Sequence, residues 1–561
     1  MALATVRAWQ RAWLADDAFI SLRYARNLVD GHGLVYNAGE YVEGYTNLLW
    51  TLILAAGMAS GLSGELVAKV MGIVAWLALI AVLAWRAGMH ARRTDTTVLP
   101  LAAGIITVMP ASQLWASGGL ETSLFAFLVT AGLIHLATDE PSQRRLMLAG
   151  VLLALATLTR PDGALFAAVG VGATAYGDAD SWRERGRRVA ALVTPLVLVG
   201  GVLLAFKLTY YGAWLPTAFY AKSAADPYYS QGLYYIGLFL ADNWILPAAT
   251  LLLLLGLRGR FVHTLGVDCR VFGAAFALYL VYVAHSGGDF MHGRRIMMTL
   301  PLFALVLERL VNALDRRAAY AVSLFILTGA ALPLDPFDGQ ALRLHGVAEE
   351  YAFYPPTTLA RRAAEGNLAH DVFGATPLRA MYSGGMCMFG YYSRLPYLAE
   401  MTGLTQYSLA QTPLVRRGMV GHEKAASEDW LHDNGIDLVF LRDTVPLESD
   451  GRRDPRILRI GPTLSARVVR YRDEVMNALE GHNEVDYVPI ADVIEAAERA
   501  LPALGRDDAR ALLEWLDAWY FDHARDATVV RTRLHDLAAR APNGNDAPMR
   551  CAADGHDAGC T

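Results

Sequence analysis

The segment LADDAFISLRYARNLVDGHGLVYNAGEYVEGYTNLLW, residues 14–50, decides the fold prediction for this chain. It is polar and aromatic, it carries the adjacent carboxylates Asp16 and Asp17, and a long series of apolar stretches follows it. Carboxylates at a membrane face are costly unless they are solvated, paired or used in function. We therefore expect this segment to lie at a membrane surface and to carry chemistry.

The composition indicates a membrane protein. The chain has 561 residues, of which 54% are hydrophobic and 18% charged, and its mean hydropathy is +0.29. Soluble proteins carry about 25% charged residues. The deficit falls in the first three-fifths of the chain, which predicts a polytopic α-helical membrane domain with a soluble remainder. The arginine clusters are short and lie between apolar stretches, which argues against a nucleic-acid partner.

Ten apolar stretches are candidate membrane spans, and they predict about 10–11 spans with membrane lipids as neighbours. They cover residues 65–86, 97–112, 121–137, 145–159, 161–176, 188–208, 230–257, 270–286, 292–314 and 318–334. A further apolar run, 45–62, is expected to form an interfacial or half-inserted helix, because counting it as a full crossing would invert the charge pattern of the loops.

Positive charge alternates between the loops. One set of loops holds Arg86, Arg92, Arg93, Arg144, Arg145, Arg183, Arg185, Arg187, Arg188, Arg258, Arg260, Arg270, Arg309, Arg316 and Arg317. The other set holds only Arg160, Lys207, Lys222, Arg294 and Arg295. The positive-inside rule places the first set in the cytoplasm. We expect a multi-pass protein of the cytoplasmic (inner) membrane, with segment 14–50 and everything after about residue 335 on the extracytoplasmic, or periplasmic, side.

This orientation leaves residue 16 outside after only fifteen residues, too few to span a bilayer. The segment 1–15 also lacks the apolar core of a signal peptide. Either the N-terminus is translocated without a helix of its own, or a first helix lies upstream of the residue numbered 1, and we favour the second.

The outer loop 14–50 supplies the candidate base. Asp16 or Asp17 would take a proton from an acceptor hydroxyl. The structural alternative is a solvated helix N-terminus, where aspartate is common. In a helix over 14–29, Arg23 would share a face with Asp16 and serve as a further phosphate ligand. The same loop offers three polar side chains as substrate contacts: Glu43, Tyr45 and Asn47.

The run GGDFMHGRR, residues 287–295, supplies the candidate phosphate site. Asp289 and His292 are expected one helical turn apart as substrate contacts, and the guanidiniums of Arg294 and Arg295 suit a phosphate. The alternative for this arginine pair is a headgroup anchor. Lys222 is a second phosphate candidate, and snorkelling to the membrane surface explains it about equally well.

Two further interpretations stay open. Arg160 and Asp162 flank a proline between two spans and contact either the substrate or each other, in a structural hairpin with an internal ion pair. A divalent cation is conceivable, because Asp16, Asp17 and Asp289 could converge on one. The histidines show no metal-ligand spacing, so the sequence predicts no metal site.

Several motifs in one order carry a family resemblance. They are residues 16–50 together with LTRPDGALF, YYGAWLPTAFYAK, GGDFMHGRR and MTGLTQYSLAQTPLVRRGMVGHEK, which ends at residue 424. The chain resembles GT-C membrane glycosyltransferases, most closely terminal β-(1→2)-arabinofuranosyltransferases and related pilin arabinofuranosyltransferases.

The resemblance implies a donor sugar on a polyprenyl phosphate, decaprenylphosphoryl arabinofuranose in the first place, and a glycan or glycoprotein acceptor on the outer face. It makes Asp16 or Asp17 the catalytic carboxylate, and Arg294, Arg295 and Lys222 the phosphate ligands. Alternatives are a mannosyl- or other hexosyltransferase, or, in a different class, a lipid-linked glycan transporter. A transporter would place polar groups near mid-membrane, and those positions are almost free of charge here.

The C-terminal part is predicted to be a separate soluble domain. The expected divisions are a membrane domain over 1–334, an extracytoplasmic α/β domain over 335–540 and a flexible tail over 541–561. Strands are expected within 435–443 and 484–490, and helices over 491–501 and 507–521. Cys551 and Cys560 could form a local disulfide in the tail, and Cys269 should be a free cytoplasmic thiol.

Overall fold

The computed structural model describes residues 2–94, 98–138, 141–177, 181–257, 266–337, 343–374, 376–385, 387–442, 445, 448–449, 452–524 and 527–542. Arg258, Arg260 and nearly all of the predicted tail, with Cys551 and Cys560, lie outside these residues. The chain forms two compact units. Unit 1 contains Met1–Leu359 and Leu404–Lys424, and unit 2 contains Ala360–Gly403 and Ala425–Thr561. Unit 1 thus takes in two segments beyond the domain break predicted at 334.

Unit 1 is helical. Its helices are α1 (Ala2–Gln10), α2 (Ala18–Val29), α3 (Leu48–Ala59), α4 (Gly64–Thr94), α5 (Leu101–Val108), α6 (Pro110–Ser117), α7 (Thr122–Leu136), α8 (Gln143–Thr159), α9 (Gly163–Tyr176), α10 (Trp182–Tyr210), α11 (Thr217–Ala221), α12 (Tyr229–Asp242), α13 (Ile245–Leu257), α15 (Val267–His285), α16 (Arg294–Met297), α17 (Leu300–Val311), α18 (Arg316–Ala331), α19 (Glu350–Phe353) and α22 (Tyr407–Ala410). Strands β1 (Arg343–Leu344) and β2 (Val347–Ala348) form a short antiparallel pair.

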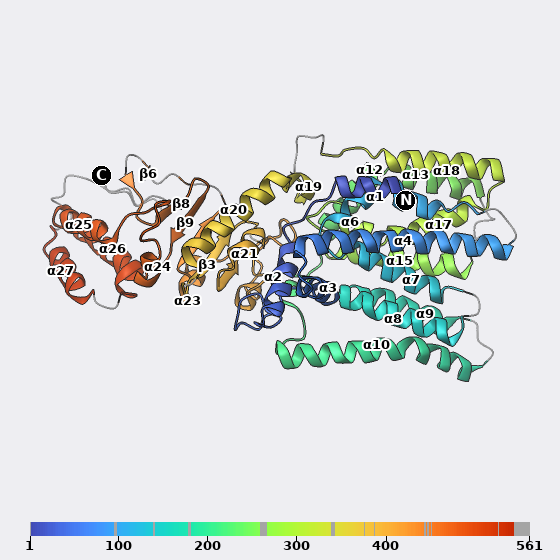
Figure 1. The fold of residues 1–561 in the computed structure, drawn as a ribbon, viewed down its shortest axis with the longest axis horizontal. Helices are drawn as coiled ribbons and strands as arrows, with labels where there is room; N and C mark the ends of the chain where they lie inside the picture. Colours follow the sequence, from blue (N-terminus) through green and yellow to red (C-terminus); the bar gives the residue numbers. More distant parts are fainter. Residues whose placement is uncertain are drawn as a thin grey trace. The chain divides into compact units, whose positions relative to one another are not determined.

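The longer helices of unit 1 run side by side in Figure 1, with α8 packed against both α7 and α10. Each predicted apolar stretch overlaps at least one of these helices. The core between them is apolar and aromatic, with Trp76, Phe125, Phe166 and Phe272 almost fully buried. Burial of such side chains against neighbouring helices is what holds the bundle together.

The number of long spans is smaller than the 10–11 predicted. Among the described residues, α4, α10 and α15 are long and apolar enough to cross a membrane, and up to five spans result if two bent pairs count as one span each. The pairs are α6 with α7, bent by 111°, and α12 with α13, bent by 83°. The first break follows the sequence, because Gly118 and Gly119, the latter with φ +78°, stand between α6 and α7. The chain is a multi-pass membrane protein with several interrupted helices.

The predicted interfacial helix within 45–62 is α3, a twelve-residue apolar helix. It begins directly after Asn47 and packs against α2.

The arginine-rich loops meet at one end of unit 1. Arg86 of α4 pairs with Asp268, at the start of α15, and its NH1 lies 3.6 Å from the Glu308 carboxylate of α17. Arg309 of α17 hydrogen-bonds His90 of α4. These contacts join the ends of α4 and α17 to the start of α15, as the alternating charge pattern predicts.

Unit 2 is an α/β structure. Its strands are β3 (Arg379–Ser383), β4 (Tyr397–Glu400), β5 (Leu438–Leu441), β6 (Glu448–Ser449), β7 (Arg452–Arg453), β8 (Ile457–Ile460), β9 (Leu464–Val468) and β10 (Val485–Asp486). Its helices are α20 (Pro356–Phe373, whose first turn belongs to unit 1), α21 (Cys387–Ser393), α23 (Glu428–Asp433), α24 (Asp473–Asn477), α25 (Ile490–Ala500), η2 (Leu501–Ala503), α26 (Arg506–Leu516), η3 (Asp517–Phe521) and α27 (Thr528–Ala539).

The main sheet of unit 2 has six strands in the order β10-β8-β9-β5-β3-β4. β3 pairs in parallel with β4 and β5, and the remaining neighbours are antiparallel. The strands and helices predicted after residue 435 are present as β5, β10, α25 and α26. Strand β5 is almost fully apolar and buried, which explains its central position.

Candidate active site

Asp16 and Asp17 stand directly before α2, at the end of unit 1 opposite the arginine-rich loops. Asp17 is the N-cap residue of α2, but its side chain does not cap the helix. Asp16 is 5% exposed, whereas Asp17 is half-buried. The helix begins at Ala18, so the predicted helix over 14–29 starts four residues late. The two carboxylates therefore differ, and Asp17 is the more accessible.

Arg294 and Asp289 form a buried ion pair beside this helix start. Arg294 donates from Nε to one carboxylate oxygen at 2.7 Å, and its NH2 lies 2.7 Å from the same oxygen, with side-chain exposures of 7% and 4%. Burial alone would raise the pKa of Asp289, but the charges of Arg294 and Lys222 hold it below its usual value. Arg294 also lies within electrostatic reach of Asp17 and Glu121. The Arg294 guanidinium therefore pairs with Asp289 and lies within electrostatic reach of two further carboxylates.

The segment that carries Asp289 is not the helical turn predicted from its spacing. Residues 286–293 form a turn and loop between α15 and α16. The glycines explain this: Gly288 has φ +74°, and a Cβ there would lie 2.5 Å from Cβ of Tyr235. A side chain is excluded at that position both by backbone conformation and by space. The loop is fixed by Ala348, whose N–H donates to Phe290 O and whose carbonyl accepts from His292 N.

Lys222 brings a second cation to the same place. It follows α11, and it lies within electrostatic reach of Asp289, Arg294 and Asp17. Burial is the main cause that lowers the pKa of its ammonium, with Arg294 acting in the same direction and Asp289 opposing. In the described part of the chain, its ammonium has no hydrogen-bond partner and no ion pair. A half-buried ammonium without such a partner is suited to bind an anionic ligand.

Glu121 and Arg160 form a second buried group of charges next to the first. Arg160 donates from NH1 to Glu121 at 2.6 Å and from Nε to Asp162 at 3.0 Å. Asn47 donates to the other Glu121 oxygen at 2.8 Å, and Tyr279 donates to Asp162 at 2.9 Å. The hairpin with an internal ion pair is thus present. These contacts link the ends of α7, α8, α9 and α15.

Glu350 and His422 also lie at the site, although neither was predicted as a site residue from the sequence. Glu350 is 6% exposed, and its pKa is raised to about 9, by burial first and then by the charges of Asp17 and Asp16. His422 packs edge-on against Phe290, with ring centroids 4.8 Å apart, within electrostatic reach of Asp17. Both lie in segments that hydropathy assigned to the soluble part of the chain.

Arg295 and His292 turn away from this group. Arg295 donates to Gly288 O at 2.9 Å and to Ser286 Oγ at 2.5 Å, and its guanidinium lies 4.7 Å from the ring centroid of Tyr282. His292 lies between Phe239 and Phe337, and burial lowers its pKa to about 4. The two adjacent arginines therefore do not face one phosphate together.

The remaining predicted residues of loop 14–50 hold the loop in place. Arg23 donates to Tyr36 O at 2.8 Å and to Asn37 Oδ1 at 3.1 Å. Tyr45 shares a hydrogen bond with Tyr211 at 3.1 Å. Glu43 pairs with Lys207 at 2.9 Å, while its second carboxylate oxygen is buried without a partner among the described residues. Of Arg23, Tyr45 and Glu43, only Glu43 has a buried side-chain oxygen without a hydrogen-bond partner among the described residues.

No three His, Cys, Asp or Glu side chains in the described ranges are arranged to hold a metal ion. The candidate convergence of Asp16, Asp17 and Asp289 on one cation is not found there, and Asp289 pairs with Arg294 instead.

Comparison with known proteins gives two curated relatives. The chain is 30% identical over 339 residues to the terminal β-(1→2)-arabinofuranosyltransferase of Mycobacterium tuberculosis, a match that covers 53% of this chain and 52% of that protein. It is 30% identical over 355 residues to the protein of the same name from Corynebacterium glutamicum, covering 55% of this chain and 49% of the relative. The chain thus spans about half the length of the curated relatives it matches. The predicted resemblance to this group is confirmed.

Among solved structures, the chain is similar to ArnT from Cupriavidus metallidurans, in the apo state and bound to undecaprenyl phosphate. Both matches have a TM-score of 0.48 and cover 83% of this chain and 96% of that chain, at 12% and 13% identity. No protein-family model matches the chain.

Proposed function

We propose that this chain is a GT-C glycosyltransferase that moves a sugar, D-arabinofuranose in the first place, from a polyprenyl phosphate to a glycan or glycoprotein hydroxyl. The observation that carries the proposal is that Asp17, Lys222 and Arg294 lie within electrostatic reach of one another at one end of an apolar helix bundle. The similarity to two arabinofuranosyltransferases supports the choice of sugar.

The proposed reaction assigns one task to each charge. Asp17 takes the proton from the acceptor hydroxyl, whose oxygen forms the new bond to the anomeric carbon. The bond from that carbon to the phosphate oxygen breaks, and polyprenyl phosphate leaves with the electron pair. Lys222 and Arg294 stabilise the negative charge that develops on the phosphate. Asp17 is assigned the base rather than Asp16, because it is the more accessible carboxylate and its side chain does not cap α2.

The location of the site fits a lipid-linked donor. The charged groups stand at helix ends, so a prenyl chain could lie along the apolar helices while its phosphate reaches Lys222 and Arg294. The positive-inside rule assigns this end, which is poor in arginine, to the extracytoplasmic side of the inner membrane. Glu43, with its unused carboxylate oxygen, is the proposed contact of loop 14–50 to the acceptor.

The test is transfer by purified full-length protein in detergent. Radiolabelled decaprenylphosphoryl arabinose is supplied with arabinan oligosaccharides, and the product linkage is analysed by methylation. A new arabinofuranosyl bond is the expected result. Transfer from a polyprenylphosphoryl mannose but not from the arabinose donor would keep the enzyme class and overturn the sugar. Movement of intact donor across a vesicle membrane without a new bond would replace transfer with transport.

A further inference from the structure

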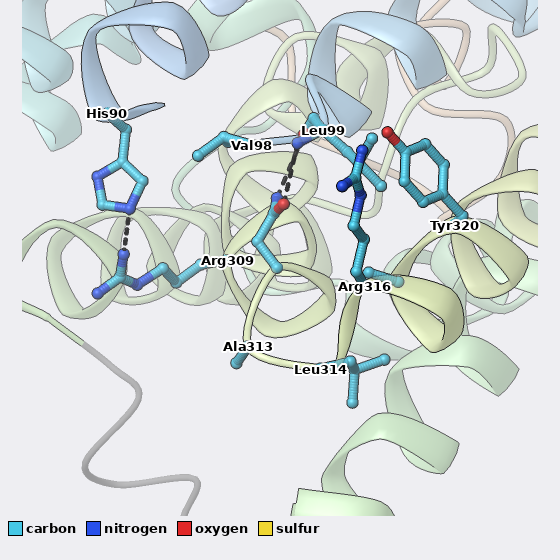
Figure 2. A pocket seen from close by; sticks show the side chains of 10 residues that line it. His90, Val98, Leu99, Arg309, Ala313, Leu314, Arg316 and Tyr320 are labelled. Atoms are coloured by element: carbon cyan, nitrogen blue, oxygen red, sulfur yellow. Dashed lines mark hydrogen bonds between the residues drawn. The ribbon is translucent and has the colours of Figure 1, made fainter. Parts of the chain in front are cut away.

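A cavity lies at the other end of unit 1, among the arginine-rich loops. Its volume is about 500 Å³, and its walls come from the ends of α4 and α17, the segment before α5 and the start of α18. Figure 2 shows Arg309, Arg316 and Tyr320 around it. Helix α15 separates the two ends: it begins beside Asp268, the partner of Arg86, and it ends at the loop that carries Asp289. Its 19 residues correspond to about 28 Å, so this cavity is distinct from the candidate active site.

The lining of the cavity is positively charged. Among the described residues, the lining includes Arg309 and Arg316 and no acidic side chain. His90 accepts a hydrogen bond of 2.6 Å from Arg309, since a guanidinium can only donate. Arg316 is exposed and forms no ion pair with any described residue. The cavity therefore favours an anion, and Arg316 is the cation most available to it.

Two described acids on the neighbouring helices α17 and α18 have other partners. The Asp315 carboxylate accepts from the backbone N–H groups of Arg317 and Ala318, as the cap of α18. Glu308 accepts from Ala102 N at 3.0 Å and faces Arg86. Asn312 fixes the wall instead of binding a ligand: its side chain exchanges hydrogen bonds of 2.9 and 3.2 Å with the backbone of Leu99. None of these groups neutralises Arg316.

The rest of the lining is apolar and continues onto an exposed apolar face. Val98, Leu99 and Leu314 line the cavity beside the arginines. Tyr320 is 47% exposed, and Leu324, one turn further along α18, is 68% exposed. In a membrane protein such a face contacts acyl chains. The arginines of the cavity could thus bind a phosphate group, while the adjoining apolar face of α18 could contact a hydrocarbon chain.

We propose that this cavity binds the phosphate of an anionic phospholipid, with an acyl chain along Tyr320 and Leu324 of α18. Basic pockets between membrane helices on the arginine-rich side are suited to such headgroups. A free phosphate ion would use the arginines but not the apolar face. The proposal does not depend on the chemistry at the other end of unit 1.

The test compares lipid retention by two variants of the full chain in phosphatidylcholine nanodiscs doped with phosphatidylglycerol. R316Q removes one of the two arginines that line the cavity. R317Q removes the same positive charge from an exposed neighbour that does not line the cavity. Native mass spectrometry counts retained phosphatidylglycerol. We expect R316Q to weaken retention about tenfold, as for one charge-assisted hydrogen bond, and R317Q to behave as the parent chain.

Three results would overturn the proposal. Equal loss in R316Q and R317Q would mean that the lipid is held by general surface charge. Full retention in R316Q would exclude the cavity. Binding of inorganic phosphate, measured calorimetrically in neutral detergent, together with no preference for phosphatidylglycerol over phosphatidylcholine, would make this a site for a free anion.

Discussion

Arg294 donates from Nε to one oxygen of Asp289 at 2.7 Å, with NH2 at the same distance, while the other oxygen accepts from the backbone N–H of Met291 at 3.4 Å. Lys222 lies within electrostatic reach of Asp289, and Asp17 within reach of Arg294, so the pair is one part of a larger group of charges. A phosphate that enters can share Arg294 with Asp289 without breaking the pair.

The ion pair should respond differently to loss of each partner. Either R294Q or D289N leaves a buried charge unpaired and should cost about 3–5 kcal/mol of stability. R294Q should also raise KM for the lipid donor, whereas D289N frees the guanidinium and should leave that KM unchanged or lower. Thermal unfolding in detergent and donor titrations at fixed acceptor measure both effects. If D289N raised the KM for the donor and R294Q did not, Asp289 rather than Arg294 would be the residue that binds the donor.

Loss of the proposed base should stop transfer without unfolding the protein. D17N should lower kcat by about 100-fold or more, the usual contribution of a positioned general base. D30N, at the exposed end of the same helix, is the matched control and should retain activity. Sugar transfer and thermal unfolding are measured on the same preparations. Normal turnover by D17N would remove Asp17 from the mechanism.

Loss of the proton from the Lys222 ammonium should limit the activity at high pH. Burial lowers the pKa of its ammonium, so its positive charge is present below that value and is lost as the pH rises through it. In K222R the cation persists to a pKa above 12, and the alkaline limb of kcat/KM for the donor should move to higher pH. The measurement is a pH profile of both proteins at low donor concentration. An unshifted limb would show that another group titrates there.

Glu350 should make stability fall with rising pH. Its pKa is raised to about 9 in the folded protein, against about 4.3 in an unfolded chain. Between these values the folded state keeps a proton that the unfolded state has lost, so its stabilising contribution is full below the lower value and lost as the pH rises to about 9.

The neutral variant E350Q should remove this dependence. Its unfolding temperature relative to the parent chain should therefore climb from pH 5 to pH 9. E474Q, at an exposed glutamate of unit 2, is the control and should track the parent chain. Parallel curves for E350Q and the parent would mean that Glu350 is charged in the folded protein at neutral pH.

Arg160 and Glu121 should act as a structural pair. E121Q and R160Q should each destabilise the protein, and the double variant should be less destabilised than the sum, with a coupling of about 0.5–3 kcal/mol. Folded E121Q should keep its KM for donor and acceptor. A strong rise in either KM with normal stability would instead place this pair in contact with substrate.

The sequence alone determined where the helices form and which loops share an end of the bundle. Apolar stretches must be buried or face lipid, and arginines avoid one side of the membrane, so hydropathy and charge suffice for both statements. They do not determine helix breaks such as the bend between α12 and α13, which depend on local packing. The motif around Asp16 and Asp17 likewise drew attention to the end of unit 1 where Asp289 and Arg294 also lie, since rare polar residues in an apolar chain are easily seen.

Only the tertiary structure decided which charges meet. Arg294 and Arg295 are neighbours in sequence, yet the first faces Asp289 and the second packs on Tyr282, because successive residues of helix α16 point in different directions around its axis. Glu350 joins Asp17 from a position more than three hundred residues away. Pairing energies depend on distance and burial in three dimensions, and neither can be read from spacing along a chain.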